Sequence, residues 1–464
     1  MPTSGALNEL GDDDNTQVPL LSLIEGAYPR LAPGIARKDG VVRRLSLSSL
    51  FGLAYAGAVF LANLMPFLRL ARHANAIPRL PEPPSPSLAT DWPRVSIIVP
   101  ARNEEQGVRA AVESLLRQDY PALELVVIND RSTDQTGAIL SALAEEHPGR
   151  LRVVTVAELP NGWLGKNHAL WLGACQSSGA WLLFTDADVV FDPTCLRRAL
   201  AYAEAQKLDH LTMSPTLLAH GYWLNAFVNF FLYAFAVFAR PDLANDPRSQ
   251  VGVGVGAFNL IRRSAYERIG THRAISLRPD DDIKLGMRVK LAGLRQCLLN
   301  GADMLSVRWY ATLGGAIRGL EKNSFAGVEY RVSRVLGAVA VLAGALAAPW
   351  ALVWIARGWT RRLLAAAVAT QALTYVGANW LNRRPILRYL PSFPFTALLF
   401  CYVALRSTWL TLRQGGIRWR DTLYPLAELR EQTGLEGLSG RAHEPERGER
   451  HRCGGERQRN GGGS

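Results

Sequence analysis

The stretch that decides the fold is Trp181-Leu-Leu-Phe-Thr-Asp-Ala-Asp188, in which four apolar residues lead into two aspartates separated by one alanine. A short apolar run of this kind, preceded by Gly179, is typical of a buried β-strand. The two carboxylates follow the carboxyl end of that strand, and side chains one residue apart face the same way on extended backbone. Hard oxygen ligands at this spacing suit Mg²⁺ or Mn²⁺, so Asp186 and Asp188 are candidate metal ligands. The alternative is an acidic loop that caps the next helix near Asp192.

Apolar runs alternate with segments of helical spacing on the amino side of this strand. Strands are predicted at Val95–Val99, Leu123–Ile128, Leu151–Val156 and Trp181–Phe184, and helices at Glu104–Gln118, Asp134–Glu146 and Lys166–Ser178. This alternation indicates an α/β fold with a largely parallel sheet that helices cover on both faces. Ligands of such sheets bind beyond the carboxyl ends of the strands, and Asp130 and Asp186 each follow a strand end.

Further charged residues are predicted at the same edge of the sheet. Asp130 is placed to accept a hydrogen bond from a base or a ribose hydroxyl, whereas Asp134 is interpreted as a helix cap. Lys166 stands near a helix start and after a glycine, a position from which it reaches a phosphate, with a surface lysine as the alternative. Asp280-Asp281-Asp282 is either a poised general base, because neighbouring acids raise one another's proton affinity, or a solvated turn that caps a helix.

Long apolar runs outside this region predict membrane helices. The runs Leu45–Leu68, Leu336–Ala356, Leu363–Trp380 and Leu390–Leu410 are each long enough to span a bilayer. Tyr222–Ala239 stands at the lower limit and is interpreted as an interfacial or acceptor-facing helix, or else as a buried core helix. The predicted segments are a polar amino-terminal segment (1–44), a transmembrane helix (45–68), a proline-rich linker (78–93), a catalytic domain (94–330), a transmembrane region of about three helices (336–412) and a basic, largely disordered tail (413–464).

Composition narrows the class of partner. The chain has a formal net charge of +12, but 48% of its residues are hydrophobic and they gather in long runs, so the arginines are interpreted as neighbours of lipid headgroups. No basic element interleaved with aromatic residues stands out, so we expect no nucleic-acid partner. The five cysteines are scattered without paired spacing, which favours a reducing compartment over a disulfide framework or a zinc site.

These motifs together resemble the nucleotide-diphospho-sugar domain of family 2 glycosyltransferases, which has the GT-A fold. The resemblance is carried by Val-Ser-Ile-Ile-Val-Pro-Ala-Arg-Asn-Glu-Glu from Val95, by Ile-Asn-Asp-Arg-Ser-Thr-Asp from Ile128, and by Thr185-Asp-Ala-Asp188. Asp281-Asp-Ile-Lys-Leu-Gly286 is similar to the acceptor-side motif Glu-Asp-x-x-Leu-Gly of the family. Ile417-Arg-Trp-Arg-Asp-Thr-Leu-Tyr424 is similar to the segment that follows the last membrane helix in many members. Members that glycosylate carotenoid, hopanoid or sphingoid lipids share this layout of helices.

The resemblance implies an inverting hexosyl transfer that depends on Mg²⁺ or Mn²⁺. Asp282 takes the position of the catalytic base and Asp281 that of the preceding glutamate. Asp188 binds the metal, with Asp186 close to the nucleotide, the sugar and the metal. The implied donor is a UDP- or GDP-sugar, and the other residues assigned to it are Ala101, Glu104, Asp130 and Lys166.

One departure separates this chain from the polymer-making members of the family. Those members carry Gln or Arg three residues before an Arg-Trp pair, whereas here Leu305 precedes Arg308-Trp309. Arg318 and Lys322 lie later and are candidates for contact with the diphosphate or the acceptor. The leading hypothesis is therefore a single transfer to a lipid or polyprenyl hydroxyl at the cell (inner) membrane, with the catalytic domain in the cytoplasm. The alternatives are a processive polysaccharide synthase and a non-catalytic membrane scaffold with a degenerate sugar-nucleotide domain.

Overall fold

The computed structural model describes residues 46–82, 92–380, 386–419 and 422–432. The chain divides into two compact units, residues 1–49 and 50–464, and the sheets and cavities belong to the second. The predicted polar segment 1–44, most of the predicted linker and most of the predicted tail lie outside the described residues.

A seven-stranded sheet forms the centre of the predicted catalytic domain, with the strand order β3-β2-β1-β4-β8-β6-β9. Its strands are β1 (Val95–Ala101), β2 (Leu123–Asp130), β3 (Leu151–Val156), β4 (Trp181–Phe184), β6 (His210–Ser214), β8 (Asn259–Arg262) and β9 (Gln296–Asn300). β1 runs parallel to both β2 and β4, and β8 runs antiparallel to both β4 and β6. The prediction of a mostly parallel α/β fold is confirmed.

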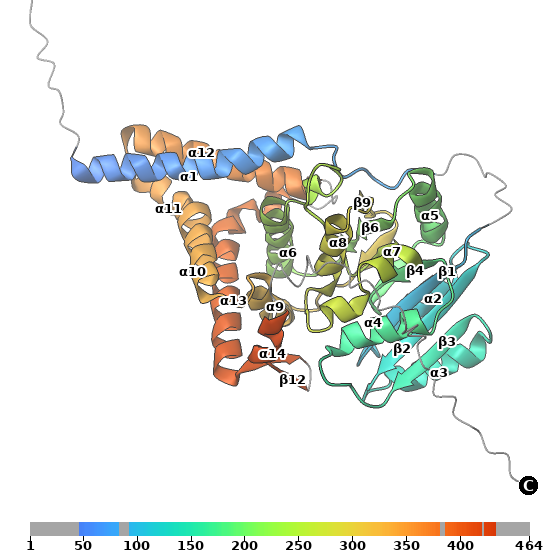
Figure 1. Ribbon diagram of the computed structural model, residues 1–464. Coiled ribbons are helices and arrows are strands. Elements are labelled where there is room, and N and C mark those ends of the chain that lie inside the picture. The colour runs from blue at the N-terminus through green and yellow to red at the C-terminus, as the bar shows by residue number, and fades with distance from the viewer. Residues whose placement is uncertain (1–45, 83–91, 381–385, 420–421, 433–464) are drawn as a thin grey trace, which may run out of the picture. The chain divides into compact units, whose positions relative to one another are not determined.

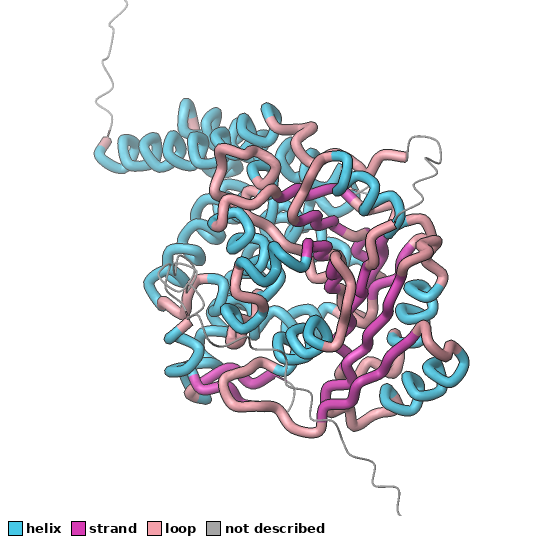
Figure 2. The backbone as a smooth tube through the Cα atoms, turned by 45° about the vertical axis from the view of Figure 1, so that its right-hand side comes forward, coloured by secondary structure: helices cyan, strands magenta, loops and turns pink. Residues whose placement is uncertain are grey.

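Helices cover the two faces of this sheet, and Figure 2 shows the strands crossing the domain between them. Ile97 and Val99 of β1 face one side, where they join a core with three helices, while Ile98 faces the other side. The first face packs against α2 (Val108–Leu116), α3 (Thr136–Glu146) and α5 (Cys195–Ala205). The second face packs against α4 (Gly165–Cys175), α7 (Arg263–Arg268) and α8 (Asp281–Leu291). Burial on both faces explains why the strands are nearly continuous apolar runs.

Shorter elements extend the sheet edge where the carboxyl ends of β1, β2 and β4 meet. A three-stranded sheet in the order β5-β10-β7 contains β5 (Val189–Phe191), β7 (Thr216–Leu217) and β10 (Leu305–Val307). The short helices η2 (Pro241–Leu243) and η3 (His272–Ile275) precede β8 and α8, and α9 (Leu313–Gly327) follows β10. β5 begins one residue after Asp188, so it fixes the loop that holds the two aspartates.

Four of the described helical segments are long and apolar enough to cross a membrane: Leu47–Arg72, Tyr222–Ala239, Val332–Ile355 and Leu387–Gln414. They correspond to α1 (Leu47–Arg72), α6 (Tyr222–Ala234) with the π-turn η1 (Phe235–Ala239), α10 (Val332–Ala340) with η4 (Val341–Ala347) and α11 (Ala348–Ile355), and η5 (Leu387–Ser392) with α13 (Phe393–Gln414). Three of these match predicted spans. The segment Tyr222–Ala239 is long enough to span, with the core of α6 buried and Phe238 at its end half exposed.

The fourth predicted span, Leu363–Trp380, is helical within α12 (Gly358–Trp380) but is not among the four candidates. Polar residues lower the mean hydropathy of this helix, and two of them bond to neighbouring helices. Gln371 accepts a hydrogen bond from Trp350 Nε1 at 2.7 Å and donates one to Ala345 O at 2.8 Å. Asn379 donates to Asn229 O of α6 at 3.1 Å. α12 therefore packs against the more apolar helices through a face that carries hydrogen-bonded polar side chains.

After α13 the chain returns to the catalytic domain (Figure 1). The hairpin of β11 (Gly416–Trp419) and β12 (Thr422–Pro425) leads into α14 (Leu426–Glu431). Ile417 and Tyr424 of this hairpin are buried in one cluster with Leu164, which precedes α4, and with Phe325 of α9. The segment that follows the last apolar helix thus packs onto the domain that holds the predicted site.

Candidate active site

A cavity of about 280 Å³ opens at the carboxyl ends of β1, β2 and β4. These strands are parallel neighbours, so residues that follow them meet at one edge. The predicted donor and metal residues that line the cavity are Ala101, Glu104, Asp130, Lys166, Asp186 and Asp188, and the predicted Lys322 lines it too. Seven of the predicted residues therefore surround one space, and Ala101, Asp130 and Asp186 are those that lie at or shortly after the carboxyl end of a strand.

Asp130, the last residue of β2, is fixed in place by hydrogen bonds. Arg131 donates to both of its oxygens, from Nε at 2.8 Å and from Nη2 at 3.0 Å. Arg131 has a φ of 54°, which is unusual for a residue with a long side chain and indicates local strain. A methyl group on Gly165 would lie 2.4 Å from Asp130 Oδ2, so the start of α4 approaches this carboxylate as closely as glycine allows. Asp134, predicted as a helix cap, does accept from Thr136 N at the start of α3.

Lys166 joins the donor side of the cavity to the predicted base. Its ammonium lies 2.9 Å from Asp186 Oδ1 and 3.4 Å from Asp281 Oδ1. Burial alone lowers the pKa of Lys166, but Asp186, Asp281 and Asp282 together raise it above its usual value. The ammonium therefore stays charged and bridges two acidic segments that lie almost 100 residues apart in the sequence.

Gly256 brings Asp186 and Asp282 together. Its N–H donates to Asp282 Oδ2 at 2.8 Å, and its carbonyl accepts from Asp186 N at 3.1 Å. The loop before it runs so close to α8 that a methyl group on Gly254 would meet the backbone oxygen of Asp282 at 1.9 Å. The alternating glycines and valines at 252–256 thus form the strip of backbone that joins the two carboxylates.

The three acids at 280–282 have different surroundings. Burial raises the pKa of both Asp281 and Asp282, while Lys166 opposes the shift. Neither residue is on the lining of the cavity: Asp281 pairs with the lining residue Lys166, and Asp282 is linked to the lining residue Asp186 through Gly256. Asp280 is not solvated, because Arg278 donates to it at 2.9 and 3.0 Å.

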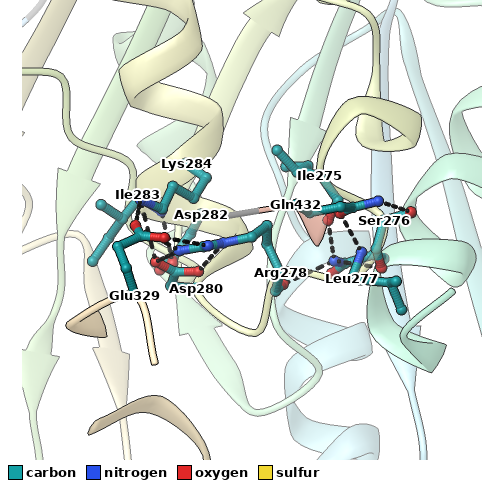
Figure 3. A network of polar contacts seen from close by, with 11 residues as sticks. Ile275, Ser276, Leu277, Arg278, Asp280, Asp282, Ile283, Lys284, Glu329 and Gln432 are labelled. Carbon is teal, nitrogen blue, oxygen red and sulfur yellow. Dashed lines mark hydrogen bonds and ion pairs between the residues drawn. The ribbon is translucent and has the colours of Figure 1, made fainter. Parts of the chain in front are cut away.

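Arg278 lies at the centre of a buried polar network that fixes the start of α8 (Figure 3). Its guanidinium also donates to Glu329, and Lys284 reaches the same carboxylate at 3.0 Å. In the same view Gln432 binds the loop before α8, since its Oε1 accepts from Leu277 N at 2.9 Å. The loop that carries the three acids is therefore held both by the turn that follows α9 and by the carboxy-terminal segment.

Asp188 shows the features of a cation site. Burial raises the pKa of its carboxyl, and the nearby Asp186 and Glu104 raise it further. A divalent cation would relieve this repulsion between carboxylates. Among the described residues no three His, Cys, Asp or Glu side chains form a metal-holding group by themselves. Asp186 and Asp188 thus fit a cation whose remaining ligands come from a bound diphosphate, which is how Mg²⁺ is commonly held.

Four further residues that line the cavity were not singled out from the sequence: Arg102, Tyr310, Trp419 and Tyr424. The pKa of Tyr310 is raised to about 12 by burial and by the nearby Asp188 and Asp186. Trp419 lies under the Lys322 ammonium, which is 3.7 Å from the ring centroid. The hydroxyl of Tyr424 accepts from Gly165 N at 3.4 Å. The sequence signal for the last two was the resemblance of 417–424 to the family's post-helix segment.

Arg318 is the predicted site residue that stands apart. It lies one turn before Lys322 on α9, is exposed, and is not part of the cavity lining. The four cysteines in the described part of the chain, Cys175, Cys195, Cys297 and Cys401, are all free, in agreement with the absence of paired spacing.

Comparison with known proteins gives one family. The model described as "Glycosyltransferase like family 2" matches residues 93–331. The chain is similar to the probable glycosyltransferase YdaM of Bacillus subtilis, with 37% identity over 100 residues, which is 21% of this chain and 23% of that protein. It is also similar to the 4,4'-diaponeurosporenoate glycosyltransferase of Staphylococcus haemolyticus, with 33% identity over 123 residues, 26% of this chain and 32% of that one. These two alignments thus cover less than a third of each relative's length.

A longer alignment relates the chain to the 4,4'-diaponeurosporenoate glycosyltransferase of Staphylococcus aureus, with 22% identity over 345 residues, 72% of this chain and 89% of the relative. Among solved structures, the chain is similar to the mannosyltransferase PcManGT of Pyrobaculum calidifontis in complex with GDP-Man and Mn²⁺. The TM-score is 0.46 and the identity 21%, and the alignment covers 78% of this chain and 98% of the other.

Proposed function

Because the chain belongs to glycosyltransferase family 2, with the GT-A fold expected from its motifs, we propose that it moves a sugar from a nucleotide-diphosphate donor to a lipid hydroxyl. The observation that carries the proposal is the meeting of Asp186 and Asp282 at Gly256. It joins a diphosphate-binding edge to a buried carboxylate, which are the two halves that a direct displacement at the anomeric carbon requires.

The donor side is built to receive negative charge. Lys166 and Lys322 place two ammonium groups on the cavity wall, and a UDP- or GDP-sugar would bring its diphosphate between them. Asp186 and Asp188 would hold Mg²⁺ or Mn²⁺, which supplies charge neutralisation for the departing nucleoside diphosphate. Asp130, whose two oxygens are already oriented by Arg131, accepts a hydrogen bond from a hydroxyl group of the nucleoside.

On the acceptor side, Asp282 is the general base. Its Oδ2 is aimed by the Gly256 N–H, and burial keeps its pKa above that of a free aspartate, which improves its match to a hydroxyl proton. Asp282 takes the proton of the acceptor hydroxyl while the acceptor oxygen forms its bond to the anomeric carbon. The bond from that carbon to the diphosphate oxygen breaks with its electron pair, so the configuration inverts. Asp281, paired with Lys166, holds the ammonium next to the developing charge.

Three observations support a lipid acceptor and a single transfer. Four helical segments are apolar enough to cross a membrane, and two relatives carry the name of a carotenoid glycosyltransferase. Leu305, which stands where polymer-making members have a polar residue, is buried in the hydrophobic core. We place the enzyme in the cell membrane with its catalytic domain in the cytoplasm, where nucleotide sugars are supplied.

The experiment incubates membranes that contain the protein with labelled nucleotide sugars and Mg²⁺ or Mn²⁺, and then extracts the lipids. Label in the organic phase is the expected result, and label confined to high-mass carbohydrate contradicts the proposal. Asp282→Asn should lower kcat for transfer by about 10²–10⁴-fold, the usual contribution of a general base, while donor binding persists. Asp119→Asn is the matched control, because that carboxylate is 58% exposed and pairs with Arg197 on the surface. Full transfer by Asp282→Asn would rule out the assigned base.

A further inference from the structure

A second cavity, of about 420 Å³, lies between α1, η1 and α12, and is called here the apolar cavity. Its walls are almost entirely hydrocarbon: Phe67 and Leu70 come from α1, Phe235 from η1, and Leu373 and Val376 from α12. Figure 1 shows α1 and α12 next to each other, away from the donor edge of the sheet. Its lining shares no residue with that of the cavity at the carboxyl ends of β1, β2 and β4, which is called here the donor cavity.

Among the described residues, the apolar cavity opens on the side of α12, where side chains of its lining are exposed. Leu373 and Trp380, both on its lining, are 56% and 73% exposed. Two of the three helical segments around it, Leu47–Arg72 and Tyr222–Ala239, are candidates for crossing a membrane. If they are immersed in a bilayer, the opening faces lipid chains rather than water. A hydrocarbon chain is then the occupant whose chemistry fits both the walls and the opening.

One carboxylate interrupts this apolar lining. The Asp242 side chain is 3% exposed, and neither of its oxygens accepts a hydrogen bond among the described residues. Its neighbours are Arg69 Nε at 3.2 Å and His73 Nδ1 at 3.7 Å. The other guanidinium nitrogens of Arg69 bind the carbonyls of Ala236 and Val237 in η1. A buried acceptor oxygen that receives no hydrogen bond is costly, so a ligand that donates one is favoured there.

Two links connect the apolar cavity to the active site. Val255 is on its lining, and the next residue, Gly256, donates to Asp282. A row of half-buried rings forms the second link. Phe235 of the apolar cavity lies 6.2 Å from Phe231, Phe231 lies 4.4 Å from Trp309, and Trp309 lies 4.9 Å from Tyr310 of the donor cavity. Aromatic rings in such a row provide a continuous apolar surface between the two cavities.

We propose that the apolar cavity holds the hydrocarbon chain of a hydroxyl-bearing amphiphile, with Asp242 accepting a hydrogen bond from a polar group of that molecule. The inference rests on the proposed function, because it makes this amphiphile the acceptor whose hydroxyl reaches Asp282. The chain enters from the bilayer between Leu373 and Trp380 and lies along the aromatic row.

Photolabelling tests the site without requiring catalysis. The protein in phosphatidylcholine vesicles is exposed to a long-chain fatty alcohol with a diazirine in its chain, and the labelled peptides are mapped. We expect saturable labelling in residues 67–77, 232–242 and 373–380. Unsaturable labelling, or labelling spread over the outer faces of the helices, overturns the proposal.

A matched pair of glycine variants separates occupancy from fold. Gly377 lines the cavity and Gly337 lies exposed on α10, both on helices and both with no atom within 4 Å of an added Cβ. Gly377→Phe should displace about two methylene groups of ligand and weaken labelling about tenfold, whereas Gly337→Phe should leave it unchanged. Equal labelling of the two variants overturns the proposal.

The polar contact and the dependence on the proposed function have their own readouts. The methyl ether of the same probe donates no hydrogen bond, so it should label wild type less than the alcohol does, and Asp242→Asn should reduce that preference. Equal labelling by alcohol and ether in wild type overturns the role of Asp242.

Gly377→Phe should retain metal-dependent hydrolysis of the donor while transfer to lipid falls. Saturable labelling with no sugar transfer in any variant would leave the lipid site standing and contradict the proposed function instead.

Discussion

Replacing Gly256 by alanine would place a methyl group between the two carboxylates that we assign to the donor and acceptor sides. A Cβ built on Gly256 lies 2.6 Å from Asp186 Oδ2 and 3.5 Å from Asp282 Oδ2. The first distance is shorter than any real contact of this kind, which begins near 3.0 Å. Asp186 therefore has to move by about 0.4 Å or more, or the strip of backbone that carries Gly256 has to move away from both acids.

The magnitude follows from how steeply catalysis depends on position. A misplacement of about 1 Å costs roughly a hundredfold in rate, so a shift of half that size should lower kcat for transfer about tenfold to a hundredfold. The fold should survive, because overpacking by one methyl group costs about 1–3 kcal/mol. The loss should fall on transfer and on donor hydrolysis alike, since Asp186 belongs to the donor side.

The assay measures release of nucleoside diphosphate and transfer of label to lipid, together with a melting temperature in detergent. Gly107→Ala is the matched control, since its added methyl would meet the Cβ of Asp188 at an ordinary 3.5 Å. It adds the same group beside another aspartate of the same cavity, Asp188, and should keep most of the activity. Near-wild-type turnover by Gly256→Ala at an unchanged melting temperature would refute the assignment of Asp186 and Asp282 to one site.

Two further predictions concern stability. Arg278→Met should lower the free energy of unfolding by about 3 kcal/mol, because it removes one partner from a buried charge network. Arg248→Met is the control, since the Arg248 side chain is 89% exposed, and it should change this free energy by under about 0.5 kcal/mol. Equal effects of the two variants in chemical denaturation would contradict a stabilising role of the network. Burial lowers the pKa of His210 to about 4, so the unfolded chain takes up a proton near pH 6.5 that the folded protein refuses until about pH 4. As the pH is lowered from about 6.5 to about 4, the free energy of unfolding should thus decrease by up to about 3 kcal/mol. His210→Gln should remove this decrease, and chemical denaturation at several pH values measures it.

The donor half of the site could be predicted because its residues follow strands. All four predicted strands begin at the predicted residue, and two of them end as predicted while the other two extend two residues further, so the positions of Asp130 and Asp186 followed directly. The first helix was predicted too early, at Glu104 rather than Val108. Glu104 N donates instead to Thr136 Oγ1, and Asn103 has a φ of 54°. Contacts between two loops, which local spacing does not encode, replaced the first helical turn.

The meeting of Asp186 with Asp282 was beyond sequence reasoning for a related reason. It depends on a loop that carries no charged residue of its own and on glycines that admit close backbone approach, such as Gly254 against α8. Tyr310 was missed because nothing in its local sequence marks it as a neighbour of Asp188. The predicted span within α12 is not among the four most apolar segments because polar residues interrupt it, and local sequence did not show that one of them, Gln371, would find partners on neighbouring helices.

The residues matched by the family model do not form the whole wall of the donor cavity. The matched region ends at residue 331, yet Trp419 and Tyr424 on the cavity wall come from the hairpin after α13. That hairpin is held from the catalytic side by the Lys322 ammonium on Trp419 and by Gly165 N on Tyr424. A helix apolar enough to cross a membrane thus leads directly into two residues of the cavity that we propose as the sugar-nucleotide site. The last of the apolar helices therefore has a role beyond its apolar length, because the segment that follows it forms part of the wall to which we assign the donor.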